Sequence, residues 1–126
     1  MAGRNQLERV RFVRMNEAKF RALALALPEA VESAHMGHPD FRVRGKIFAT
    51  LGPDRTWGMV KLTPPQQQEF VTIAGETFSA ISGAWGRGGA TKVTLRGARE
   101  ASVRRALRLA WANMAPRKLL EEEEDR

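Results

Sequence analysis

Three basic residues, Arg42, Arg44 and Lys46, lie within five positions in the stretch HPDFRVRGKIFATLG, residues 38–52. Their guanidinium and ammonium groups could contact phosphates or another anion, and the alternative is an ordinary solvated edge. Most of the apolar residues around them are typical of strands, and Gly45 can adopt a positive φ, so the stretch predicts a β-hairpin. The three cations would then lie at the tip of this hairpin.

Two further lysines lie in later stretches that are typical of strands: Lys61 in residues 57–62 and Lys92 in residues 91–95. Successive side chains of a strand point to opposite faces of the sheet. If the apolar residues face the helices, Arg42, Lys61 and Lys92 share the open face of the sheet. The alternative is an open antiparallel face that is simply polar and solvated.

The glycine-rich segment GAWGRGGA, residues 83–90, predicts a tight loop that presents Trp85 and Arg87. A tryptophan beside an arginine forms a stacking platform for a base, a peptide or a small molecule. The alternative is a tryptophan that covers the sheet edge as part of the core. The segment is neither a P-loop nor a dinucleotide-binding motif, because it lies between two strands and lacks the Lys-Ser/Thr pair.

His35, His38 and Asp40 form the one cluster whose residue types and spacing suit a metal. Zinc requires three or four converging ligands, and no fourth candidate is near in the sequence. We therefore expect no metal and no other cofactor, and these polar side chains would instead pin a loop. No recognisable set of nucleophile, base and acid occurs, and the chain contains no cysteine. These features predict a protein without catalytic residues.

The chain is strongly basic, with 21 Lys and Arg against 14 Asp and Glu, a net charge of +7. Five of the acids lie in residues 121–126, and the remainder carries 20 basic and 9 acidic residues, a net of +11. A small domain of this charge attracts polyanions, and solubility is the alternative role of the charge. No apolar run could span a membrane, no signal peptide is recognisable and cysteine is missing, which favours the cytoplasm. The arginine-rich composition favours a bacterial source.

The order of the predicted elements defines an α+β fold. Helices are predicted at 16–27, 64–74 and 98–115, strands at 40–44, 46–51, 57–62, 77–82 and 91–95, and a loop at 29–39. The close spacing of the first three strands favours an antiparallel meander. We expect an antiparallel sheet of about five strands, with the N- and C-terminal helices packed on one face.

Apolar stripes identify the buried faces of the helices. Phe20, Leu23 and Leu27 form one stripe in the first helix. In the middle helix, Phe70 and Ile73 are expected to face inward. The last helix has the strongest pattern, and its inward face consists of Val103, Leu107, Ala110, Trp111 and Met114.

Residues 15–120 are predicted to form a single domain. Within residues 1–14, Leu7, Val10 and Val13 recur at i, i+3 and i+6, a spacing that permits a short additional helix. Residues 121–126 are expected to be a disordered acidic tail.

Four segments, FRALALALPEAVESAHMGHPDFRVRGKIFATLG, WGMVKLTPPQQQEF, GAWGRGGATKVTL and AWANMAPRKLL, resemble in order the MmcQ/YjbR family over about residues 16–120. The resemblance implies a frataxin-like (CyaY-like) fold, in which helices cover one face of an antiparallel sheet. Members are often bacterial and of unassigned role, and the family is usually labelled DNA-binding. Many relatives carry a second tryptophan where this chain has Ala90, so a contact made by that tryptophan would be absent here. The stretch MNEAKFRALALAL, from Met15, resembles the start of family members, which implies that residues 1–14 are an N-terminal extension.

The implied fold invites a comparison with iron-binding frataxins, which use an acidic ridge on the first helix. In this chain Glu17 and Glu29 are accompanied by Lys19 and Arg21, so no carboxylate cluster is available there. We expect no iron site.

These inferences together predict a non-enzymatic DNA-binding protein of the MmcQ/YjbR type, which binds duplex DNA weakly and with little sequence specificity. Basic residues on the open sheet face and at the hairpin tips would contact phosphates. The predicted nucleic-acid-binding residues are Arg42, Arg44, Lys46, Lys61, Trp85, Arg87 and Lys92. The alternative is a module that binds a small anionic ligand or a protein partner on the same face, with Trp85 as an anchor.

Overall fold

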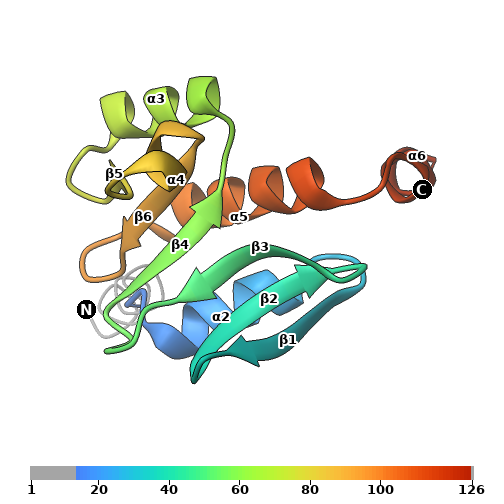
Figure 1. Ribbon diagram of the computed structural model, residues 1–126, viewed down its shortest axis with the longest axis horizontal. Helices are drawn as coiled ribbons and strands as arrows, with labels where there is room; N and C mark the ends of the chain where they lie inside the picture. Colours follow the sequence, from blue (N-terminus) through green and yellow to red (C-terminus); the bar gives the residue numbers. More distant parts are fainter. Residues whose placement is uncertain (1–13, 126) are drawn as a thin grey trace, which may run out of the picture.

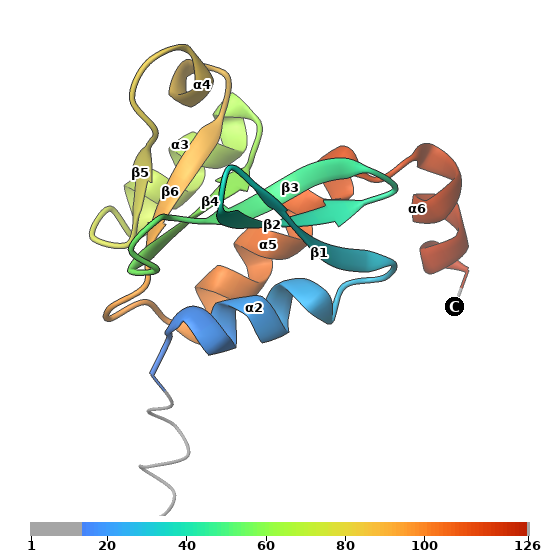
Figure 2. The ribbon, with the colours of Figure 1, turned by 60° about the horizontal axis from the view of Figure 1, so that its bottom comes forward.

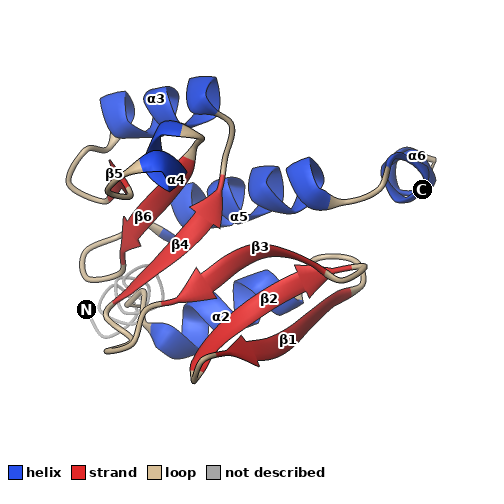
Figure 3. Cartoon of the chain, in the orientation of Figure 1, coloured by secondary structure: helices blue, strands red, loops and turns tan. Residues whose placement is uncertain are grey.

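The computed structural model describes residues 14–125 and contains a six-stranded antiparallel sheet with helices packed against it (Figure 1, Figure 3). The helices are α2 (Glu17–Leu25), α3 (Pro64–Ile73), α4 (Ala84–Arg87), α5 (Glu100–Met114) and α6 (Arg117–Glu124). The strands are β1 (Ala30–His35), β2 (His38–Val43), β3 (Lys46–Leu51), β4 (Trp57–Lys61), β5 (Phe78–Ala80) and β6 (Ala90–Thr94). Their order in the sheet is β1-β2-β3-β4-β6-β5.

The sheet and the helices form two layers. α2 and α5 lie on one face of the sheet, which is the lower face in Figure 2. α3 lies next to α5, where Arg105 forms an ion pair with Glu69 and contacts the ring of Phe70. The predicted α+β class is confirmed, and the sheet has six strands where about five were expected.

The additional strand is β1, which lies in the segment predicted as a loop. It forms one edge of the sheet and pairs with β2 along its whole length, ending at His35 opposite His38. Met36 and Gly37, with φ of 52° and 81°, form the turn between the two strands. Five of the six side chains of β1 are exposed, so this edge strand lacks the apolar alternation by which strands are recognised in a sequence.

Local sequence sets the boundaries of several elements. Asn16 caps the start of α2 with its side chain, and Thr63 and Gln66 form a capping box at the start of α3. Arg44 and Gly45 have φ of 49° and 83°, as a two-residue hairpin turn requires, so β2 and β3 are connected at the predicted position.

The core lies between the sheet and its helical layer. Trp111 is 1% exposed, and its indole N–H donates to the carbonyl oxygen of Pro28 at 2.9 Å. Phe70 is also buried and packs against Phe78 with 4.8 Å between the ring centroids. The prediction that Ile73 faces inward is wrong, since this residue is 73% exposed. α3 covers only the β5 side of the sheet and buries a single residue, Phe70.

The C-terminal end of the chain differs from the predicted disordered tail. Residues 121–124 belong to the helix α6, where a disordered tail was expected. Leu119 is 2% exposed and joins α6 to the core, and this apolar burial stabilises a helix whose charge alone predicts disorder.

The predicted extension, residues 1–14, lies outside the described residues except for Arg14. Within the described chain, every helix is too short or too polar to cross a membrane.

Candidate nucleic-acid interface

The guanidinium of Arg42 is engaged by a carboxylate of its own strand. Its Nε and Nη2 donate to the two carboxylate oxygens of Asp40 at 2.8 Å and 3.0 Å. Asp40 is 1% exposed, and its hydrogen bonds with Arg42 raise the pKa of that guanidinium. A phosphate would have to compete with Asp40 for these two donors.

Arg44, at the tip of the hairpin, is engaged in the same way. Its Nε and Nη2 donate to Glu29 at 2.6 Å and 2.9 Å, which holds the pKa of the Glu29 carboxyl below its ordinary value. The pKa of Arg44 is raised, chiefly by these hydrogen bonds and in part by the charge of Glu122 in α6. α6 lies at the same end of the molecule as the hairpin tip (Figure 1, Figure 2). Two carboxylates, those of Glu29 and Glu122, therefore act on the guanidinium at the tip.

Lys46 is the one cation of the hairpin without a carboxylate partner. It is exposed and forms no ion pair within residues 14–125. Its register opposite the fully buried Val43 places it on the helical side of the sheet, whereas Arg42 lies on the open side. The three residues Arg42, Arg44 and Lys46, which we call the hairpin cations, thus do not form one surface.

Lys61 and Lys92 lie on the face of the sheet that points away from α2 and α5. Lys92 pairs with Met59, two residues before Lys61, whereas the intervening Val60 is fully buried on the helical face. The ammonium of Lys92 lies 5.3 Å from the centre of the Trp57 ring. Neither lysine forms an ion pair in the part of the chain that the structure describes.

The glycine-rich segment forms one turn of helix, α4, instead of an irregular loop. Gly86 and Gly89 permit this turn: a Cβ on Gly86 would lie 1.6 Å from the carbonyl oxygen of Ile81, and Gly89 has a φ of +113°. α4 presents Trp85, which is 75% exposed, and the exposed Arg87. Trp85 therefore does not cover the sheet edge as part of the core.

The residue that holds α4 in place, Gln67 of α3, is not apparent from the sequence. Its Nε2 donates to the carbonyl oxygens of Gly86 and Ala90 at 3.0 Å and 2.9 Å, and lies 3.3 Å from the hydroxyl of Thr91. Gln67 is the middle of three consecutive glutamines, and its partners lie 19 to 24 positions further along the chain. No local pattern distinguishes it from its neighbours.

Trp85 and Lys61 line the same pocket, which has a volume of about 470 Å³. Much of the remaining lining is apolar and includes Met59, Leu62, Pro64, Ala84 and Met114. Lys92 lies two positions along β6 from Ala90, which also lines the pocket. The hairpin cations do not line it, and the hairpin tip and α4 lie far apart in both views (Figure 1, Figure 2).

The two histidines and Asp40 do not converge on a common point. His35 and His38 face each other across the turn between β1 and β2, while Asp40 is engaged by Arg42. Residues 14–125 contain no group of three or more His, Cys, Asp or Glu side chains that could hold a metal ion.

The architecture is that of an α+β protein in which the open face of the sheet carries two lysines without an ion pair in residues 14–125, and α4 presents an exposed tryptophan that shares a pocket with one of them. The family model described as YjbR matches residues 25–113, and the chain belongs to this family, which confirms the resemblance noted from the sequence. The crystal structure of Deinococcus radiodurans protein DR2400, family-model domain DUF419, has a similar fold, with a TM-score of 0.68 over 82% of each chain. At 16% identity this likeness concerns the fold alone. A comparison with curated proteins finds no match.

Proposed function

We propose that this protein binds duplex DNA weakly and with little sequence specificity, and that it does so without catalysing a reaction. One observation carries the proposal. Three cations form no ion pair within the described residues and occur together with the exposed Trp85 on β4, α4 and β6: Lys61, Arg87 and Lys92. Unpaired cations can contact successive phosphates, which is the sequence-independent part of DNA recognition. The net charge of +7 favours the same partner through long-range attraction.

The contact surface in this proposal is smaller than the one predicted from the sequence. Arg42 and Arg44 contribute less, because a phosphate must displace a carboxylate that already occupies two donors of each guanidinium. Lys46 lies apart from the remaining cations. We call the remaining set the β4–β6 surface, and it consists of Lys61, Trp85, Arg87 and Lys92.

Three phosphate contacts imply a modest, salt-sensitive affinity. We expect a dissociation constant of about 10⁻⁴ to 10⁻⁶ M near physiological salt, typical of non-specific binding. The logarithm of the affinity should fall with the logarithm of salt concentration, with a slope of about −0.9 per phosphate neutralised. A bacterial cytoplasm, where DNA is accessible, is the location in which this function would operate.

Fluorescence anisotropy with a labelled duplex, at three salt concentrations, tests the proposal. Two duplexes of unrelated sequence should bind with the same affinity and the same salt dependence, because the protein would contact phosphates and not base edges. Failure of both duplexes to bind at the lowest salt would overturn the proposal.

The pocket beside Trp85 supports a second candidate function, the binding of a small anionic ligand. Its volume of about 470 Å³ is in the range of small-molecule sites, and Lys61 supplies a charge in an otherwise largely apolar lining. An organic anion that occupies it should change the fluorescence of Trp85. Trp85→Phe should abolish this change and leave the signals of the other tryptophans unaffected, and an identical response in the variant would contradict this function.

A further inference from the structure

A cleft lies at the opposite end of β4 and β6 from Trp85, where α2 and α5 begin. Its volume is about 1360 Å³, and Thr56, before β4, and Leu95, after β6, both line it. The charged residues of its lining are Arg14, Arg55, Arg96, Arg99, Glu17 and Glu100. None of its lining residues also lines the pocket of Trp85, so the cleft is a separate site.

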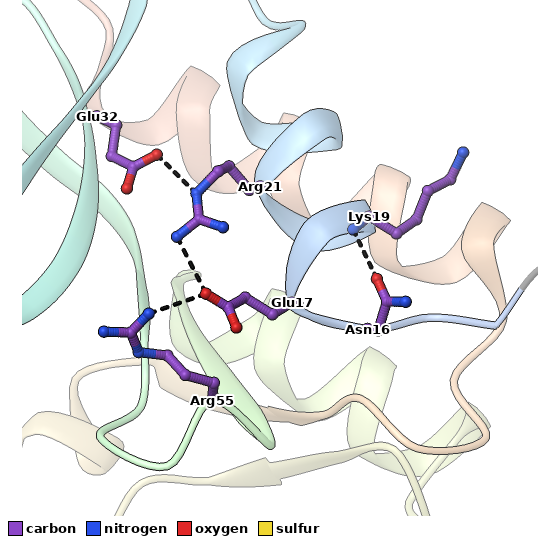
Figure 4. A network of polar contacts seen from close by, with 6 residues as sticks. All are labelled: Asn16, Glu17, Lys19, Arg21, Glu32 and Arg55. Atoms are coloured by element: carbon purple, nitrogen blue, oxygen red, sulfur yellow. Dashed lines mark hydrogen bonds and ion pairs between the residues drawn. The ribbon is translucent and has the colours of Figure 1, made fainter.

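The two glutamates of the cleft are already paired with cations. Glu17 Oε2 accepts hydrogen bonds from Arg55 Nη1 at 2.8 Å and from Arg21 Nη2 at 3.2 Å (Figure 4). The bond from Arg55 is the main reason why the pKa of Glu17 is lowered. Glu100 likewise has two cationic partners, one on α2 and one on its own helix. Neither carboxylate is therefore left to neutralise further arginines.

Arg96 and Arg99 have no such partners. Both are exposed and form no ion pair within residues 14–125. Arg96 directly precedes Gly97 and Arg99 follows it by two positions; the φ of Gly97, +79°, turns the chain between β6 and α5, so one short connection carries both guanidinium groups. Arg14, before α2, is a third arginine of the lining that forms no ion pair with any of the residues that the structure describes. The cleft therefore has an excess of positive charge.

Two further features of the cleft, the start of α5 and the side chain of Arg55, also favour an anion. Arg99 occupies the N-cap position of α5, and its side chain has no acceptor, so the N–H of Ser102 lacks the side-chain acceptor that Asn16 gives to Lys19 at the corresponding position of α2. The buried Nε of Arg55 also has no hydrogen-bond partner among the described residues. Guanidinium groups without an ion pair in residues 14–125 thus lie along one cleft, beside a helix N-terminus that has no side-chain cap.

We propose that this cleft binds a small phosphorylated compound, whose phosphate group is held by Arg96, Arg99 and Arg14. A guanidinium can donate to two phosphate oxygens at once, and a phosphate dianion can balance more than one guanidinium. The volume of about 1360 Å³ leaves room for the organic part of such a compound. The site does not depend on the proposed DNA function, because none of its arginines belongs to the β4–β6 surface.

Isothermal titration calorimetry of the full chain with pyrophosphate, at low salt, tests this site. Pyrophosphate should bind the wild type and bind Arg96→Gln/Arg99→Gln at least about tenfold more weakly, because charge-assisted hydrogen bonds are lost. Arg117→Gln/Lys118→Gln removes the same charge from α6 and should retain the wild-type affinity. Thermal melting followed by circular dichroism verifies that both double variants are folded.

Two results would overturn the site: no binding of pyrophosphate to the wild type, or an equal loss of affinity in the two double variants. Titration of the same proteins with duplex DNA separates the two sources of phosphate. Unchanged DNA affinity in Arg96→Gln/Arg99→Gln supports a free phosphorylated compound as the ligand. A parallel loss of pyrophosphate and DNA binding would assign the cleft to DNA phosphates and overturn the small-molecule proposal.

Discussion

The β2–β3 hairpin and the β4–β6 surface each carry three cations, yet the two regions differ in how many of these charges are available. At the hairpin, Arg42 and Arg44 each donate two hydrogen bonds to a single carboxylate, and the charge of Glu122 in α6 also acts on Arg44. On the β4–β6 surface, Lys61, Arg87 and Lys92 form no ion pair within residues 14–125. The sequence therefore shows how many cations a region carries. How many of them can bind a ligand depends on the carboxylates that pack against them in the folded protein.

The largest expected effect concerns the core that both regions share. Trp111 is 1% exposed and donates a hydrogen bond to Pro28, so Trp111→Ala should leave a cavity between α5 and the sheet. We expect the free energy of unfolding to fall by about 3–5 kcal/mol. Chemical denaturation measures this change, and both regions should unfold in one transition.

Arg104→Ala provides the control on the same helix. The side chain of Arg104 is 61% exposed, so its removal should change the free energy of unfolding very little. Equal destabilisation by the two substitutions would show that the inward face of α5 is wrongly assigned.

A smaller effect is expected at the hairpin tip. Arg44→Gln removes the two hydrogen bonds that lower the pKa of Glu29, so this pKa should rise toward its ordinary value. Because the folded-state pKa of Glu29 is lowered, the pair stabilises the wild type above the ordinary pKa of a glutamate. This contribution is lost as the pH falls through the lowered pKa, so the stabilities of the two proteins should converge in acid.

NMR titration of the Glu29 side chain checks this expectation, with Lys46→Gln as the control of equal charge. The control should leave the pKa of Glu29 nearly unchanged, since Lys46 forms no ion pair in the described chain. An unchanged pKa in Arg44→Gln would contradict the pairing on which the comparison of the two regions depends.

The features that were predicted correctly depend on residues close together in the sequence. The apolar stripe of α5 predicted the burial of Trp111, and the glycine at position 45 predicted the hairpin turn. Strand alternation placed Lys61 and Lys92 on one face of the sheet, as the register of β4 and β6 has them.

The pairing of Arg44 with Glu29 could not be predicted, because it follows from β1. Ala30 pairs with Val43, so the residues just outside this pair, Glu29 and Arg44, lie close together. β1 has almost no buried side chains and was expected to be a loop, so no local pattern places Glu29 beside the hairpin. The contacts of Gln67 with α4 could not be predicted from the sequence either, because they join segments that are distant in the chain.

Two triple variants of equal charge test most directly whether the β4–β6 surface, and not the hairpin, contacts DNA. One is Lys61→Gln/Arg87→Gln/Lys92→Gln, and the other is Arg42→Gln/Arg44→Gln/Lys46→Gln. In anisotropy titrations with a labelled duplex at three salt concentrations, the first should weaken binding by roughly tenfold or more and flatten the salt dependence. The second should retain most of the wild-type affinity and slope. Equal weakening of the two, or a larger loss in the hairpin variant, would contradict this account.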